Sequence, residues 1–179
     1  MDAGLVTLDS SIIVELRYAT TRNITGKPFY PPGARALLRR EAADALARVQ
    51  TKPKKQGVGL KVWDAYRPAT AQKALWDACP NDRWICPPQV GSKHSRGCAV
   101  DLTLVDLKTG EELEMPTDHD AFTDDAASKS DLPSPQARRH RTMLQMAMNG
   151  EGWVSVIFEW WHFDWPGWQQ FPLLDTPLV

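Results

Sequence analysis

The chain has 179 residues, of which 42% are hydrophobic, and this length and composition suffice for one domain with a well-formed core. Its 21 basic and 22 acidic side chains give a formal net charge of -1, which excludes a strong overall attraction to nucleic acid or to an anionic membrane. We therefore expect a small-molecule partner.

Periodic patterns in the first half of the chain alternate between strand and helix. Alternating apolar side chains predict a strand over residues 12–18, followed by a polar loop over residues 23–28. Apolar side chains recur at helical spacing over residues 36–50, which predicts an amphipathic helix. A second strand is expected over residues 58–64, and residues 69–78 should form a short helix after the turn at Arg67 and Pro68.

The second half begins with residues 79–91, which contain three prolines and show no period, so we expect a loop there. Residues 100–104 alternate as a strand does, with Asp101 facing away from the apolar side chains. The acidic residues 118–131 are typical of a long excursion, either a lid or a solvated loop.

Ser134 followed by Pro135 is a typical helix start, and Asn149 followed by Gly150 is a typical helix end. The last strand is expected over residues 153–158. No repeat or linker divides residues 1–179, so the sequence predicts one α+β domain.

The cysteines and the N-terminus bear on the cellular compartment. Cys79, Cys86 and Cys98 cannot all pair within one chain, and none forms a C-x-x-C zinc motif, which favours a reducing compartment. The sequence shows no signal-peptide pattern and no stretch as long as a membrane span. These observations predict a cytoplasmic location.

Two of the four histidines lie in segments rich in other reactive side chains. His94 is followed by Asp101, and His162 is preceded by Glu159. A catalytic zinc ion is typically bound by three His, Asp, Glu or Cys ligands and keeps one open position, so His94, Asp101 and His162 form a candidate ligand set. Gly97 would allow the sharp turn that brings His94 towards Asp101.

A regular strand would place Glu159 and His162 on opposite faces, so a bulge or a helical turn near Trp160 is required. The same residues have a simpler interpretation, in which Asp101 caps a turn and His162 is a hydrogen-bonded core histidine. The spacing of these residues alone does not favour the metal site over this simpler interpretation.

Three sequence blocks decide between them, because they resemble the signature blocks of the D-alanyl-D-alanine dipeptidases, a family that includes enzymes of vancomycin resistance. Shorter matches lie at residues 17–20 and 23–28, and the resemblance spans roughly residues 8 to 165. The three blocks are Asp64-Ala65-Tyr66-Arg67-Pro68, residues 92–104 (Ser-x-His-Ser-Arg-Gly-x-Ala-x-Asp-Leu-Thr-Leu) and Glu159-Trp160-Trp161-His162.

The resemblance implies a DD-peptidase-like or hedgehog-like fold, with a central antiparallel sheet and flanking helices. It also implies one zinc ion per chain, bound by His94, Asp101 and His162. Glu159 would be the base that takes a proton from water and returns it to the leaving amine, and Arg67 would stabilise the oxyanion.

The resemblance further implies that Tyr18, Ser92 and Asp120 line the pocket for the two ends of the dipeptide. It gives no role to His119 or His140, and His140 is expected at the surface. Two positions depart from the family's pattern. Lys93 replaces a small or neutral residue, and Cys98 replaces Ser or Thr, where a small buried side chain is favoured over an additional soft ligand.

Most of the eight tryptophans are expected in the core, and one or two could wall a small pocket. The predicted activity is zinc-dependent hydrolysis of D-alanyl-D-alanine, in cell-wall precursor turnover or in glycopeptide resistance. Two alternatives stay open: a related peptidoglycan carboxypeptidase or endopeptidase, and a non-catalytic zinc-binding module of the same fold. The oligomeric state is not predicted.

Overall fold

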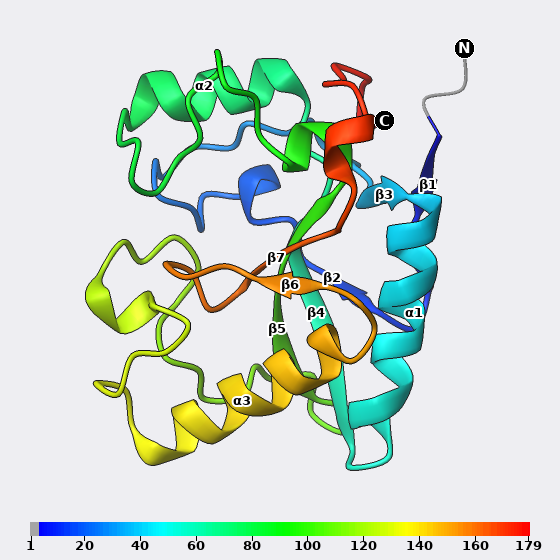
Figure 1. The fold of residues 1–179 in the computed structure, drawn as a ribbon, viewed down its shortest axis with the longest axis vertical. Coiled ribbons are helices and arrows are strands. Elements are labelled where there is room, and N and C mark those ends of the chain that lie inside the picture. The colour runs from blue at the N-terminus through cyan, green and yellow to red at the C-terminus, as the bar shows by residue number, and fades with distance from the viewer. Residues whose placement is uncertain (1–3) are drawn as a thin grey trace.

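The computed structural model describes residues 4–179, and its centre is a five-stranded sheet with the order β2-β4-β5-β7-β6 (Figure 1). Strand β2 pairs parallel to β4, and the other neighbours pair antiparallel. A small second sheet pairs β1 with β3. The strands are β1 (Leu5–Thr7), β2 (Ile13–Val14), β3 (Leu37–Arg39), β4 (Val58–Asp64), β5 (Ala99–Asp106), β6 (Val154–Ser155) and β7 (His162–Asp164).

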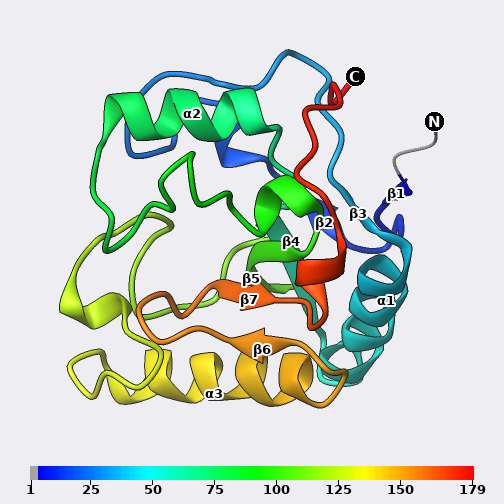
Figure 2. The same ribbon diagram turned by 45° about the horizontal axis from the view of Figure 1, so that its top comes forward.

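Within residues 4–179, three α-helices surround the sheet: α1 (Arg40–Lys54), α2 (Ala69–Ala78) and α3 (Pro135–Asn149). Figure 2 shows α2 and α3 on opposite sides of the central strands, with α1 along one flank. Helix α1 packs against β4 and α3 through its buried apolar face, which includes Leu46 and Val49. Strands β4 and β5 are buried on both faces, so their side chains form the middle of the core.

This architecture confirms the α+β class and the mainly antiparallel central sheet. The predicted bounds of β4 and α2 agree with the structure, and so do those of α3. The Ser134 side chain caps α3 by accepting a hydrogen bond from the Ala137 backbone N–H at 3.0 Å, as expected for a serine before Pro135. Strand β5 extends beyond the predicted residues 100–104 at both ends.

Two of the predicted bounds in the first half are wrong. The strand predicted over residues 12–18 is limited to β2, because the chain turns into a 3-10 helix at Arg17–Ala19. There the buried Arg17 guanidinium donates to Glu112 at 3.0 Å. The helix predicted over residues 36–50 begins at Arg40 and ends at Lys54, since the residues before Arg40 pair with β1 as β3.

The end of the chain also differs from the prediction. Of residues 153–158, only Val154–Ser155 forms a strand, because Ile157 and Phe158 lie exposed at the tip of a hairpin. No sequence pattern indicates β7, which pairs with both β5 and β6. None of the helices within residues 4–179 is long and apolar enough to cross a membrane.

Candidate metal centre and its pocket

Asp101 and His162 are register partners on the neighbouring strands β5 and β7. Cross-strand partners point to the same face, which brings the two side chains together. Trp160 and Trp161 form the turn before β7, and the His162 backbone N–H donates to the Glu159 carbonyl at 3.3 Å. This is the turn that the spacing of Glu159 and His162 requires.

His94 reaches the same point from a short 3-10 turn, His94–Arg96. Gly97 ends that turn with a φ of 71°, a conformation that glycine adopts without the strain of a side chain. A Cβ atom at Gly97 would also lie 2.5 Å from the Leu5 side chain. The expected sharp turn at Gly97 is therefore confirmed.

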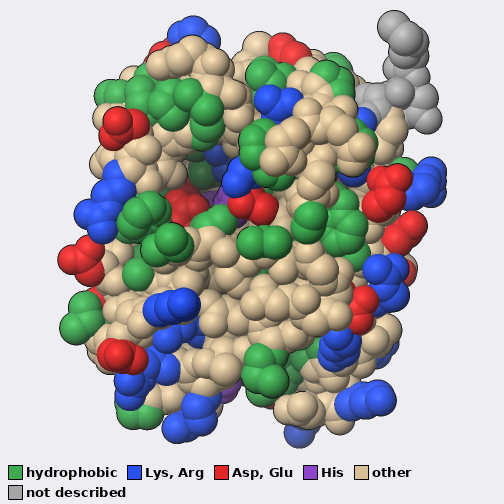
Figure 3. All heavy atoms as spheres, in the orientation of Figure 1, with side chains coloured by type: hydrophobic (Ala, Val, Ile, Leu, Met, Phe, Trp, Pro, Cys, Tyr) green, Lys and Arg blue, Asp and Glu red, His purple; other side chains and the backbone are tan. Residues whose placement is uncertain are grey.

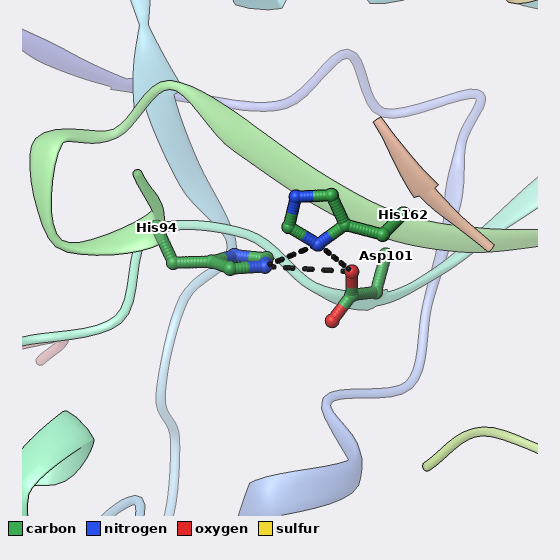
Figure 4. A group of neighbouring side chains, drawn as sticks. All are labelled: His94, Asp101 and His162. Atoms are coloured by element: carbon green, nitrogen blue, oxygen red, sulfur yellow. Dashed lines mark hydrogen bonds and ion pairs between the residues drawn. The ribbon is translucent and has the colours of Figure 1, made fainter. Parts of the chain in front are cut away.

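The three ligand atoms face one another (Figure 4). His94 Nε2 lies 3.2 Å from His162 Nδ1 and 3.4 Å from Asp101 Oδ1, and the last two atoms are 3.0 Å apart. A tetrahedral zinc ion with ligands at 2.0 to 2.1 Å would hold them about 3.3 Å apart. The triangle therefore has the size of one face of a zinc tetrahedron.

The hydrogen bonds around the triangle leave its inner atoms free to bind a cation. His94 Nδ1 donates to the Ala65 carbonyl at 2.6 Å, and His162 Nε2 donates to Asp164 Oδ1 at 3.0 Å. With these nitrogens donating outwards, His94 Nε2 and His162 Nδ1 are the ring nitrogens that face the other ligand atoms, the arrangement found in metal-binding histidines. Asp101 Oδ1 is buried and has no hydrogen-bond partner within residues 4–179.

His119 also belongs to this site, although sequence reasoning gives it no role. Its Nε2 atom donates to Asp101 Oδ2 at 3.1 Å, and the ring is buried beside Trp63 and Trp161. The pKa of Asp101 lies well below its usual value: burial acts to raise it, but electrostatic attraction from the neighbouring His94 imidazole and the hydrogen bond from His119 outweigh burial. Asp101 is thereby held as an anion.

Glu159 lies beside the triangle, with Oε2 3.7 Å from His162 Nδ1. Burial raises the pKa of the Glu159 carboxyl to about 8, and the negative charges of Asp101 and Asp120 act in the same direction. A carboxyl group with a pKa near neutrality can both accept and return a proton.

Arg67 is fixed by a buried hydrogen-bond network. Its Nε and Nη2 atoms donate to Asp64 Oδ2 at 2.9 and 2.8 Å, and Nη1 donates to Gln72 at 2.7 Å. Tyr30 donates to the other oxygen of Asp64 at 2.6 Å, and the guanidinium lies 4.7 Å from the Tyr18 ring centre. Asp64 belongs to the first of the three sequence blocks without a predicted role, and its hydrogen bonds show that it orients Arg67.

The three residues expected to line the pocket lie near the triangle. Tyr18 donates to Asp120 Oδ2 at 2.9 Å, and Ser92 Oγ accepts from the His94 backbone N–H at 3.2 Å. Among the described non-glycine residues, Asp120 alone has a positive φ, of 56°. A strained φ of this kind is typical of a residue held in place for function.

The three ligand side chains, Glu159, Arg67 and the three residues expected to bind the dipeptide all open onto one pocket of about 90 Å³. Figure 3 shows a hollow with acidic and histidine side chains at its floor and hydrophobic side chains at its margin. The lining includes Tyr18, Arg67, Ser92, His94, Asp101, Asp120, Glu159 and His162, together with Trp84, Phe122 and Trp161. Every predicted site residue therefore lies in the same pocket.

The two departures from the family's pattern have distinct surroundings. Lys93 donates to Asp164 Oδ2 at 2.5 Å, so it contacts the carboxylate that orients His162. Cys98 is buried, and burial raises the pKa of its thiol to about 11. A thiol of that pKa stays protonated at neutral pH, which favours a packing role for Cys98. His140 is half-buried and hydrogen-bonded to the Glu114 carbonyl, away from the pocket.

Comparison with known proteins supports the family resemblance of the three sequence blocks. Residues 2–176 match the model of a peptidase family described as D-ala-D-ala dipeptidase. A D-alanyl-D-alanine dipeptidase of Escherichia coli is 42% identical over 161 residues, which cover 90% of this chain and 82% of that protein. A D-alanyl-D-alanine dipeptidase of Enterococcus faecium is 30% identical and covers 91% of this chain and 92% of its own.

Solved structures with a similar arrangement include VanYB in complex with D-Alanine-D-Alanine. Its TM-score is 0.47 at 15% identity, over 75% of this chain and 74% of VanYB. A second is a mutant of the vancomycin resistance D,D-pentapeptidase VanY in complex with Zn(II), with a TM-score of 0.49 at 14% identity, over 78% of each chain.

Proposed function

Since the chain belongs to the D-alanyl-D-alanine dipeptidase family, we propose that it hydrolyses D-alanyl-D-alanine with one zinc ion bound by His94, Asp101 and His162. The observation that carries this proposal is the triangle of ligand atoms, separated by 3.0 to 3.4 Å, in a pocket that also contains Glu159 and Arg67. We further propose that residues 1–179 form a single catalytic domain.

The ligand set fits zinc, because two imidazoles and one carboxylate leave a fourth position open. A bound zinc ion would lower the pKa of water to about 7 and polarise the scissile carbonyl. Glu159 takes the proton from the attacking water, and its raised pKa lets it hold that proton until the leaving amine accepts it.

Arg67 faces the developing oxyanion. Its guanidinium stays fixed by Asp64 and Gln72, so no reorganisation is needed when charge develops on the substrate oxygen. Because Arg67 is buried, that charge is little screened by water.

The ends of the dipeptide are bound by the remaining polar side chains. Asp120, oriented by the Tyr18 hydroxyl, supplies a negative charge for the ammonium group. The Ser92 hydroxyl donates to the substrate, and its oxygen accepts from the His94 backbone N–H. A pocket of about 90 Å³ suits a dipeptide better than a long peptide.

The cellular setting follows as part of the proposal. Cys79, Cys86 and Cys98 are all free thiols, which supports the cytoplasm as the location. Hydrolysis of D-alanyl-D-alanine there serves either turnover of cell-wall precursors or glycopeptide resistance. Comparing growth on glycopeptide with and without the gene distinguishes the two.

The direct test of the reaction is D-alanine release from D-alanyl-D-alanine by the zinc-loaded protein. A parallel assay with a pentapeptide separates a dipeptidase from a carboxypeptidase. A protein that binds stoichiometric zinc and cleaves neither substrate would instead be a non-catalytic zinc module.

A further inference from the structure

Aromatic rings from three separate loops meet at one wall of the pocket. Trp84 lies after α2, Phe122 lies between β5 and α3, and Phe158 lies in the hairpin between β6 and β7. The Trp84 and Phe122 rings stack with centroids 5.3 Å apart and planes 8° apart, and Phe158 meets Trp84 edge-on at 6.0 Å. We call Trp84, Phe122 and Phe158 the aromatic clasp.

Arg83 ties the same three loops together from outside. Its guanidinium lies 4.7 Å from the Trp84 ring centre and 5.5 Å from that of Phe158, and it donates to Asp124 at 3.0 Å. The Arg83 and Asp124 side chains are 52% and 78% exposed, so their ion pair contributes little stability. The wall is therefore held by contacts among the rings and by the Arg83 guanidinium over them rather than by the ion pair.

The aromatic clasp lies close to Asp120, the residue proposed to bind the amino end of the substrate. Phe122 and Trp84 line the pocket, and Phe122 follows Asp120 by two residues. If Asp120 binds the substrate ammonium, as the proposed function has it, the clasp stands next to the amino end of the dipeptide. In a longer peptide ending in D-alanyl-D-alanine, that nitrogen is an amide and carries the preceding residue.

We propose that the aromatic clasp determines substrate length, because it occupies the path by which an N-terminal extension would leave the pocket. This inference rests on the proposed function and adds to it the residues that exclude longer peptides. Trp84 and Phe122 then determine selectivity for substrate length, and the proposed metal ligands, Glu159 and Arg67 carry out the reaction.

The test compares two substrates, D-alanyl-D-alanine and N-acetyl-D-alanyl-D-alanine, by the kcat/KM of D-alanine release. The acetyl group removes the ammonium charge for every variant alike. A change between variants in the ratio of the two kcat/KM values therefore reports the effect of the clasp on the extended substrate. Trp84→Ala with Phe122→Ala should raise the ratio of acetylated to free dipeptide at least about tenfold over the wild type.

Two control variants narrow the interpretation. Phe122→Leu keeps most of the bulk and should leave the ratio near that of the wild type. Ile157→Ala removes a 74% exposed side chain next to Phe158 that does not line the pocket, and it should leave both activities unchanged.

The outcomes separate this inference from the proposed function. If the wild type cleaves the free dipeptide and the double variant keeps the wild-type ratio, the clasp has no role in selectivity. If the wild type neither binds nor cleaves the free dipeptide, the proposed function fails and this inference is overturned with it.

A double variant that loses all turnover is tested by calorimetry in the Glu159→Gln background. Binding of the acetylated dipeptide by that variant, and not by Glu159→Gln alone, supports the inference. Absence of binding in both contradicts it.

Discussion

Asp101 and His162 are direct cross-strand partners, and Asp101 Oδ1 lies 3.0 Å from His162 Nδ1. Two of the three proposed ligands are therefore fixed by the hydrogen bonds between β5 and β7, and only His94 comes from a loop. A site built mainly on strands keeps its geometry better than one built on loops. Substitution of one side chain at this site should therefore leave the positions of the others largely unchanged.

Replacing His162 by Ala should abolish stoichiometric zinc binding, because two ligands cannot complete the coordination of a tight site. The measurement is zinc content after dialysis against a weak chelator. His140→Ala is the matched control, since His140 lies away from the pocket and should leave zinc content unchanged. Equal zinc in His162→Ala and the wild type would refute the ligand assignment.

Glu159→Gln should retain zinc and lose turnover by about 10² to 10⁴-fold, which is the usual contribution of a general base. The change preserves shape but removes the ability to accept a proton. Zinc content and kcat are measured on the same sample, with the exposed Glu111→Gln as control. Retained turnover in Glu159→Gln would exclude Glu159 as the base.

Arg67→Lys should lower kcat by about 10² to 10³-fold, the usual loss when one oxyanion donor is removed. Lysine keeps the positive charge beside Asp64 but lacks the rigid fork that contacts Asp64 and Gln72 together. Steady-state kinetics with a thermal melt as folding control measure this effect. An unaltered kcat in a folded variant would mean that Arg67 does not contact the oxyanion.

Asp164→Asn should weaken zinc binding by about 10- to 100-fold, the usual effect of losing a partner that orients a metal-binding histidine. Asp164 accepts the hydrogen bond from His162 Nε2, and Lys93 holds its other oxygen. Competition with a fluorescent zinc chelator gives the dissociation constant. Lys93→Met should produce a smaller change in the same direction, and unchanged affinity in both variants would contradict this role.

Asp120→Asn and Asp120→Ala separate charge from backbone conformation. Asn tolerates a positive φ at least as well as Asp does, so Asp120→Asn should raise KM for the dipeptide without lowering the melting temperature. Asp120→Ala should raise KM and also reduce stability. Unchanged KM in both variants would show that Asp120 does not bind the ammonium group.

Local patterns in the sequence are sufficient to predict the bounds of those helices and strands that have clear periods and end signals. Strand β4, helix α2 and helix α3 have their predicted bounds because their periods and end signals agree. Strand β7 has no such signal, since three residues are too few for a period and its register depends on β5. Tertiary pairing also overrides helical periodicity before Arg40, where β3 pairs with β1.

The site residues named from the sequence all line one pocket, yet the sequence gives no role to the residues that orient them. His119 lies in an acidic loop whose sequence gives no indication that the ring is buried against Asp101. Asp64 and Asp164 sit on strand ends, where a carboxylate has many possible partners. Such contacts depend on how segments distant in the sequence pack together, and local sequence patterns do not predict that packing.

The most direct measurement is a crystal structure of the zinc-loaded protein with diffraction data collected at the zinc absorption edge. We predict one anomalous peak per chain, about 2.0 to 2.2 Å from His94 Nε2, Asp101 Oδ1 and His162 Nδ1. A peak at any other position, or D-alanyl-D-alanine hydrolysis by a protein free of metal, would contradict the proposed zinc site.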